Sequence, residues 1–217
     1  MALPAIDTGR SRLADTLLAR AASDGSVSHP YVRSVELLDG ADSIRNQADV
    51  IHHLCLLHGR LPGLIDLAIE RSPIEASAWM ISAAATFAEE RAYITRLAVA
   101  APPLPSTPGQ AECEAAVLAQ RHALEMLATS ERAGCATGAA LAMLLDWQVV
   151  RVVLDLAADR LGAPPLRCNL PDADAIADFA AQIPPALERA VAFGAGQLFL
   201  QQRGLWDLLE CREQARR

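Results

Sequence analysis

Lysine is absent from this chain of 217 residues, and its 19 positive side chains are all arginine. The absence excludes a Schiff-base lysine, and with it lysine-anchored pyridoxal phosphate and lysine-type aldolase chemistry. It also excludes the phosphate-binding Gly-x-x-x-x-Gly-Lys loop and the strand lysine of protein kinases. The net charge of −7 argues against a nucleic-acid partner, because binding to phosphates requires concentrated positive charge.

Aromatic side chains are scarce at 4%, although 52% of the residues are hydrophobic, so alanine, leucine and valine must fill the core. No segment shows the alternating pattern of a half-buried strand, and helical periodicity runs through most of the chain. We therefore predict an all-α protein, an antiparallel bundle of about six helices, four of them long. Helices are expected over residues 8–22, 43–58, 62–71, 74–100, 111–133, 136–161, 173–182 and 184–211.

The loops at 102–109 and 162–171 are short enough to join neighbouring helices of one bundle. We expect one bundle domain over residues 36–212, preceded by an N-terminal helix and loop arm over residues 1–35. The small residues of FGAGQ, at 193–197, lie inside an expected helix and should let another helix come close.

Signals for export or a membrane span are also lacking. Five scattered cysteines form no Cys-x-x-Cys pair, and the first residues do not resemble a signal peptide, which together indicate reduced thiols in the cytoplasm. The most apolar segment, at 139–158, is interrupted by Asp146, Arg151 and Asp155. We therefore expect no membrane partner.

Two carboxylates fall on apolar helix faces. Glu90 interrupts the seam of Met80, Ala83, Phe87, Ile94 and Leu97, whereas Glu89 falls on the polar side. Asp146 lies in line with alanine and valine residues, opposite a polar face that comprises Thr137, Gln148, Arg151, Asp155 and Asp159. A carboxylate in such a place must be paired, hydrogen-bonded or protonated.

Gln120 joins the apolar side of its own helix. If consecutive helices are antiparallel, a rise of ~1.5 Å per residue puts Glu90, Gln120 and Asp146 at similar heights. These three residues are the candidates for a buried polar layer at the middle of the bundle.

Three of the five histidines lie within IHHLCLLH, at 51–58. The apolar side of this helix runs through Ile44, Ala48, Ile51 and Cys55, which predicts that His53 and Asp49 point outward and His52 lies at the margin. His58 faces inward in the last turn and is a weaker site candidate. His122 falls on a polar arc and is expected to be exposed.

A bundle of long helices with carboxylates in mid-helix resembles the ferritin-like and haem-oxygenase-like groups, and is similar to a bacterial all-helical family of unknown function. Ferritin-like di-iron sites use a Glu-x-x-His pair on each of two helices, and no Glu-x-x-His occurs here. The resemblance therefore carries over only Glu90 and Asp146, as single carboxylate ligands for iron or manganese.

Three functions remain to be weighed. The first is a non-catalytic protein that acts through self-association, as a homodimer, or through a protein or small-ligand partner. The second is a metal-binding or acid–base enzyme that uses Glu90 and Asp146 on a small apolar ligand. A transcription regulator is disfavoured, because residues 1–60 carry seven acidic and six basic side chains and form no basic module.

Overall fold

The computed structural model describes residues 11–72 and 74–217, and these contain helices and no strand. The all-α prediction is confirmed. The described residues form nine α-helices, where a bundle of about six was predicted: these are the eight expected segments, among which α4 and α8 are short, and α2, which was not foreseen. The helices are α1 (Arg12–Asp24), α2 (Val35–Leu38), α3 (Ser43–His58), α4 (Leu64–Ile69), α5 (Ile74–Ala100), α6 (Gln110–Ala128), α7 (Cys135–Leu161), α8 (Ala173–Ala181) and α9 (Glu188–Gln214), with 3-10 turns η1 (Ser26–Ser28) and η2 (Pro30–Arg33).

Periodicity predicted the ends of α3 and α5 to the residue, and most other ends to within a few residues. The expected first helix included residues 8–10, which lie outside the described residues; α1 begins after Ser11, whose hydroxyl accepts from the Ala14 amide. Helix α7 is bounded by Gly134 and Gly162, at φ of 90° and 64°. This left-handed backbone favours glycine and ends the helix at both sides.

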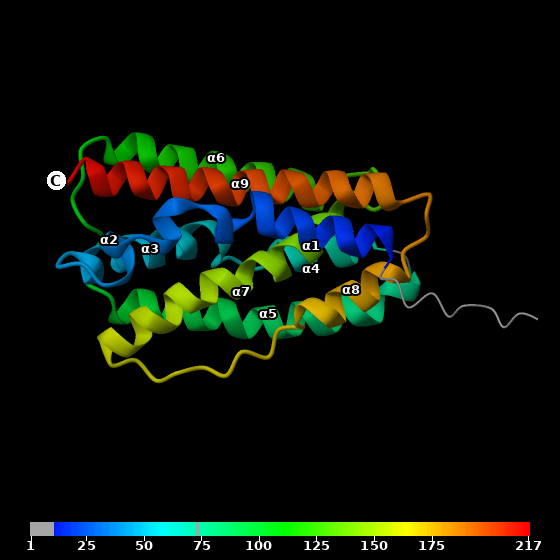
Figure 1. Ribbon diagram of the computed structural model, residues 1–217, viewed down its shortest axis with the longest axis horizontal. Coiled ribbons are helices and arrows are strands. Elements are labelled where there is room, and N and C mark those ends of the chain that lie inside the picture. The colour runs from blue at the N-terminus through cyan, green and yellow to red at the C-terminus, as the bar shows by residue number, and fades with distance from the viewer. Residues whose placement is uncertain (1–10, 73) are drawn as a thin grey trace, which may run out of the picture.

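Helix α7 forms the centre of the molecule and packs most extensively on α9 (Figure 1). The colour gradient shows α7 and α9 running in the same direction, while α6 runs the opposite way. The long return through residues 162–187 carries the chain back along the bundle, which is why α9 can start beside the start of α7 rather than beside its end.

The contact between α7 and α9 depends on two glycines. A Cβ at Gly138 would collide with the carbonyl oxygen of Val191, and a Cβ at Gly194 would collide with that of Cys135. The prediction that the small residues of FGAGQ admit a neighbouring helix is therefore confirmed. Any larger side chain at either glycine would force the two backbones apart.

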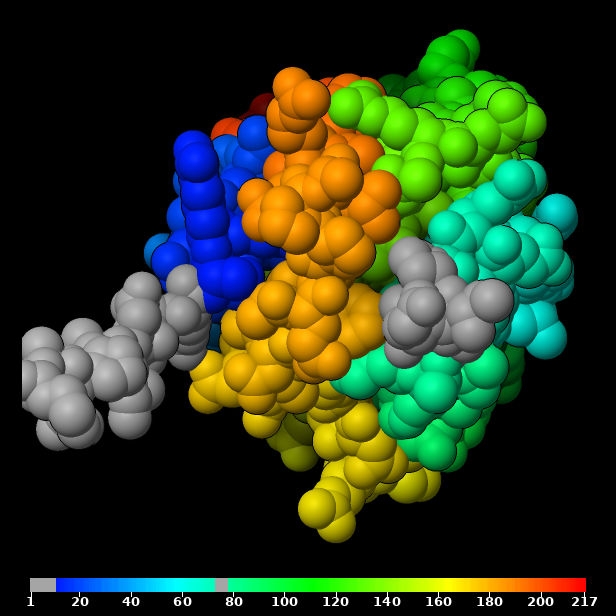
Figure 2. Space-filling model, turned by 90° about the vertical axis from the view of Figure 1, so that its right-hand side faces the viewer, coloured from blue at the N-terminus to red at the C-terminus, as the bar shows by residue number. Residues whose placement is uncertain are grey.

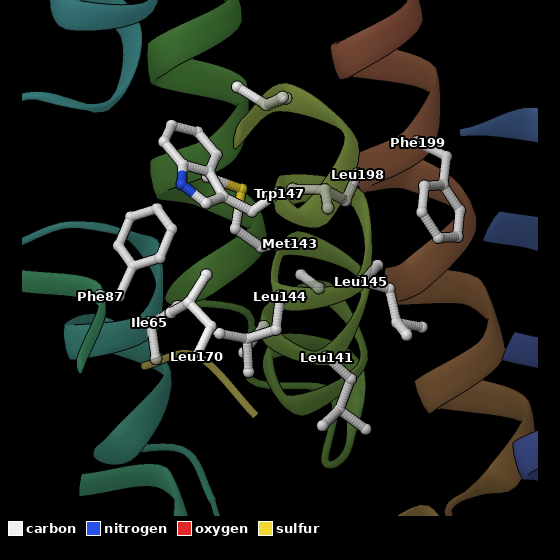
Figure 3. Close-up of a cluster of buried hydrophobic side chains, with 14 of the residues drawn as sticks. Ile65, Phe87, Leu141, Met143, Leu144, Leu145, Trp147, Leu170, Leu198 and Phe199 are labelled. Atoms are coloured by element: carbon white, nitrogen blue, oxygen red, sulfur yellow. The ribbon is translucent and has the colours of Figure 1, made fainter. Parts of the chain in front are cut away.

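The core is built mainly from aliphatic side chains, with a few aromatic rings at its centre. Figure 3 shows Trp147 of α7 beside Met143, with Phe87 of α5 on one side and Leu198 and Phe199 of α9 on the other. The rings of Phe87 and Trp147 meet edge to face, with centroids 4.9 Å apart.

The first helix also packs on this core, because α1 contacts α7, α8 and α9. Residues 1–10 of the expected N-terminal arm lie outside the described residues. None of the helices in the described residues has the length and apolar character needed to cross a membrane.

Candidate functional site

Glu90 is buried in α5 and bonded entirely to other parts of the protein. Its Oε1 lies 2.6 Å from Nη1 of Arg151, and its Oε2 accepts a hydrogen bond of 3.1 Å from the indole Nε1 of Trp147. Burial raises the pKa of Glu90, while the Trp147 hydrogen bond and the Arg151 charge oppose that rise. Glu89 is exposed.

Arg151 is a correction to the sequence analysis, which placed it on the polar face of its helix. The side chain is buried because it reaches Glu90 in the core while its Nε donates to Asp155 at 2.8 Å. Its guanidinium carbon lies 4.5 Å from the centre of the Tyr93 ring, and Nη2 donates to the carbonyl oxygen of Leu166. The polar partners of this arginine therefore draw it inward.

Thr137, which was placed on the same polar face, is also buried. It lies near the start of α7, where its hydroxyl is 3.4 Å from that of Ser72 beyond the end of α4. The first half of α7 is buried on every face, from Cys135 to Trp147. The polar face that holds in the second half of the helix therefore does not continue to Thr137.

Asp146 lies in the middle of α7 and holds the turn η1. Its Oδ1 accepts from the Ser26 amide at 2.6 Å, and its Oδ2 accepts from the Ser26 hydroxyl at 2.5 Å. That hydroxyl in turn accepts a hydrogen bond of 2.7 Å from Nε1 of Trp206. Burial raises the pKa of Asp146, and the hydrogen bonds from Ser26 and Gln202 only partly offset the cost of the charge.

His58 is buried and joined to this aspartate through Gln202, a residue that the sequence analysis missed. Its Nε2 donates to Oε1 of Gln202 at 3.1 Å, and the Gln202 side chain also hydrogen-bonds Asp146. Burial lowers the pKa of His58 to about 4, and the Gln202 contact opposes this only weakly. Gln202 follows Leu198 and precedes Leu205 at steps of four and three, the signal that could have placed it inside.

Gln120 lies apart from this polar chain. It is partly buried on α6, and its Nε2 donates to the backbone oxygen of Gln201 at 3.4 Å. Glu90, Gln120 and Asp146 thus bond to three separate sets of partners. Asp146 and His58 belong to one polar network, which Gln202 connects. Glu90 approaches that network through Trp147, whose ring centroid lies 5.5 Å from that of His58.

The interior beside His58 offers almost no free space. A hollow of about 30 Å³ lies against His58, Phe87 and Met143, and Arg121 and Glu125 are also among its lining residues. Such a volume holds about one water molecule. The described residues also contain no group of three or more histidine, cysteine, aspartate or glutamate side chains that could hold a metal ion.

The orientation predicted for α3 was wrong for Ile44, Asp49 and His53, whereas Ala48, Ile51 and His58 are buried as expected. Asp49 and His53 are both 1% exposed, whereas Ile44, expected to face inward, is 47% exposed. His53 turns back along its own helix, where its Nδ1 donates to the backbone oxygen of Asp49 at 2.8 Å and lies 3.1 Å from its carboxylate. His52 reaches the Pro102 carbonyl oxygen at 2.8 Å, so the three histidines have separate partners, and His122 is exposed as expected.

The reason for the error is a pair of arginines from the far end of the chain. Arg212 of α9 contacts both carboxylate oxygens of Asp49, at 3.0–3.1 Å, and Nη1 of Arg216 lies 2.6 Å from Oδ2. Burial alone would raise the pKa of Asp49, but the hydrogen bonds from His53 and Arg212, with the Arg216 charge, lower it to about 2. The aspartate is therefore a fully ionised, buried anchor for the end of α9.

The larger hollow is on the surface, between α1 and the first half of α9. We call it the α1–α9 groove; it has a volume of about 690 Å³ and is lined by Arg20, Asp24, Arg189, Phe193, Leu200 and Arg203, among others. Figure 2 shows α1, in blue, lying beside the orange start of α9 at this end of the molecule. The groove combines exposed apolar side chains with positive charge.

These observations define an all-α protein with a closed polar interior and an arginine-lined surface groove. The chain belongs to DUF6975, a family of unknown function, whose model matches residues 21–217. The similarity to a family of unknown function that the sequence indicated is thereby confirmed. No curated protein and no solved structure matches the chain.

Proposed function

We propose that this protein is not an enzyme and acts by holding a partner at its surface. One observation carries the proposal: the buried carboxylates are already bonded to protein donors, and the hollow beside His58 has room for about one water molecule. Glu90 and Asp146 are 1% and 2% exposed, so neither carboxylate presents a surface to a substrate. The α1–α9 groove, by contrast, is open and large.

Self-association is the first partner relationship to consider. Large apolar side chains remain exposed along several helices, including Ile81, Val99, Met126 and Val152. These side chains support a homodimer, because burying them against a second copy would remove apolar surface from water. The five cysteines are all free thiols, which supports a cytoplasmic location.

The alternative function is a ferritin-like metal site or an acid–base site for a small apolar ligand, built on Glu90 and Asp146. Iron or manganese would need both carboxylates to leave their present partners. For Glu90 this means leaving Arg151 and Trp147, and for Asp146 it means leaving Ser26. Releasing a buried arginine in this way costs several kcal/mol, about 3–5 by analogy with broken buried ion pairs.

Metal analysis of protein purified without chelators separates the two functions. The proposal expects less than about one-tenth of an equivalent of iron or manganese, and no change in Tm when either metal is added. A stoichiometric metal that is lost in Glu90→Gln and Asp146→Asn variants would overturn it. Light scattering at tens of micromolar, an order-of-magnitude working range, then tests self-association: a doubled mass supports the homodimer and a monomer mass contradicts it.

A further inference from the structure

Helix α9 carries an exposed seam along the α1–α9 groove. Arg189, Phe193, Gly196, Leu200 and Arg203 follow one another at alternating steps of four and three. This is the spacing with which one helix presents a continuous stripe to another. Phe193 and Leu200 are 46% and 58% exposed, so the apolar part of the stripe lies open.

Arg20 and Gly196 meet in the lining of the groove. Arg20 of α1 lies across α9 and donates from Nη1 to the Ala192 carbonyl oxygen at 3.2 Å. It can do so because residue 196 is glycine, where a Cβ would collide with the Arg20 guanidinium. The Arg20 guanidinium therefore occupies the space over Gly196, at the middle of the seam, and forms part of the groove lining.

The charge around the seam is positive on a protein whose net charge is −7. Arg20, Arg189 and Arg203 line the groove, and Asp24 is the acidic residue among its lining residues. Arg132 adds a further positive charge beside the Phe193 ring, at 5.2 Å from its centre. An occupant must therefore offer carboxylates at both ends of an apolar stripe.

A second copy of the same seam does not meet this requirement. Antiparallel packing of two seams about Gly196 would place Arg189 of each copy opposite Arg203 of the other, since both lie seven residues from the glycine. The two pairs of like charges would oppose such a dimer. The groove itself is thus not the surface for the homodimer proposed above.

We infer that the α1–α9 groove holds an amphipathic helix of a partner protein, with leucine-like side chains at Phe193 and Leu200 and carboxylates at Arg189 and Arg203. This inference rests on the proposed function and names the chemistry of the partner. The binding mode is that of a helix seated in a groove, in which alternate turns supply the apolar anchors.

The probe is a synthetic peptide of about three heptads with leucine at the a and d positions and glutamate at e and g, which also keeps the peptide from pairing with itself. Its matched controls carry glutamine or lysine at the same e and g positions. We expect the glutamate peptide to bind by calorimetry and the glutamine peptide to bind about tenfold more weakly, and we expect rising salt to weaken binding of the glutamate peptide more than that of the glutamine peptide.

Variants of the protein locate the binding. Arg189→Glu with Arg203→Glu should weaken binding of the glutamate peptide about tenfold or more, and Leu200→Ala should weaken it by a smaller factor. Arg33→Glu with Arg45→Glu makes the same change of net charge at exposed positions away from the groove and should leave binding unchanged. An unchanged Tm of each variant shows that it is folded.

Equal binding to the groove variant and to the control variant would overturn the inference and leave the proposed function intact. Absence of binding, or preference for the lysine peptide, would overturn the acidic chemistry. A doubled mass that is lost in Arg189→Glu with Arg203→Glu would assign the groove to a second copy instead. A stoichiometric bound metal overturns the proposed function whatever the peptides do.

Discussion

Asp49 and Asp146 are 1% and 2% exposed, yet the protein gives these two aspartates opposite surroundings. Asp49 faces Arg212 and Arg216 and has its pKa lowered to about 2, whereas Asp146 faces the neutral Ser26 and has its pKa raised. Burial acts in the same direction on both carboxyls. The difference shows that the partners, and not the depth, decide whether a buried acid is ionised.

Both aspartates nevertheless stabilise the fold in the same way, by joining distant segments of the chain. Asp49 ties α3 to the last turns of α9, and Asp146 ties η1 to the middle of α7. Each joins segments that are more than a hundred residues apart in the sequence. A carboxylate committed in this way stabilises the bundle and is not free to act on a substrate, which is the basis of the proposed non-catalytic function.

The largest effect is expected from Asp49→Ala. It leaves Arg212 and Arg216 buried without their counter-charge, which should lower the free energy of unfolding at pH 7 by about 3–5 kcal/mol. Urea unfolding measures this, with Asp39→Ala as the control, because Asp39 is 90% exposed and its bond to Arg160 should contribute less than about 1 kcal/mol. A loss of similar size in both variants would remove the distinction between an anchored and a surface aspartate.

The next effect is the pH dependence caused by His58. Its folded pKa of about 4 is below the ordinary value of 6.5, so the unfolded chain takes up a proton first as the pH falls. The contribution of neutral His58 to the free energy of unfolding is fully present above pH 6.5. As the pH falls from 6.5 to 4, this contribution decreases by on the order of 3 kcal/mol.

The His58→Gln variant should lack this part of the pH dependence, while His122→Gln, at an exposed position, should keep it. The measurement is urea unfolding at several pH values from 7 to 4. Parallel pH profiles for the wild type and His58→Gln would show that the ring is accessible to protons in the folded state.

Ser26→Ala tests the neutral partner of Asp146. The change leaves Oδ2 of Asp146 and Nε1 of Trp206 without their hydrogen-bond partner, and we expect a loss of about 2 kcal/mol in the free energy of unfolding. Ser23→Ala, at an exposed position of α1, is the matched control and should change it by less than about 0.5 kcal/mol.

Asp146→Asn should have the smallest effect at pH 7, within about 1 kcal/mol. The amide keeps an acceptor for the Ser26 amide and removes the cost of a buried charge. Because the folded pKa of Asp146 is raised, the stability of the wild type is lost as the pH rises through that pKa, so the variant should gain relative to the wild type from pH 4 to 7. If the free energy of unfolding of the variant falls relative to that of the wild type over this range, the raised pKa of Asp146 is contradicted.

The helices could be predicted well from the sequence. The burial of their polar residues could be predicted for some positions and not for others. Glu90 and Asp146 stood out because each interrupts an apolar stripe on a long helix, where 3.6-residue periodicity is reliable. Arg151 did not stand out, because its inward turn follows from Glu90 on another helix. Local periodicity carries no information about such a partner.

The error at Asp49 and His53 has the same physical origin on a larger scale. The face of α3 was assigned from Ile44, Ala48, Ile51 and Cys55, all on the helix itself, and no residue near position 49 indicates that Arg212 and Arg216 bind there. Gln202 differs from these residues, because its spacing from Leu198 and Leu205 on its own helix indicates an inward position. The α1–α9 groove depends on which helix lies beside α9, which the order of helices along the chain does not reveal.

Titration of the side-chain carboxyl groups by ¹³C NMR tests the opposite states of these two acids in a single experiment. The account predicts that the Asp49 signal stays in its ionised position down to a pH of about 2, while the Asp146 signal changes above the usual pKa of an aspartate. If both signals change near pH 4, the partners of Asp49 and Asp146 do not shift the pKa of either aspartate, and the account is contradicted.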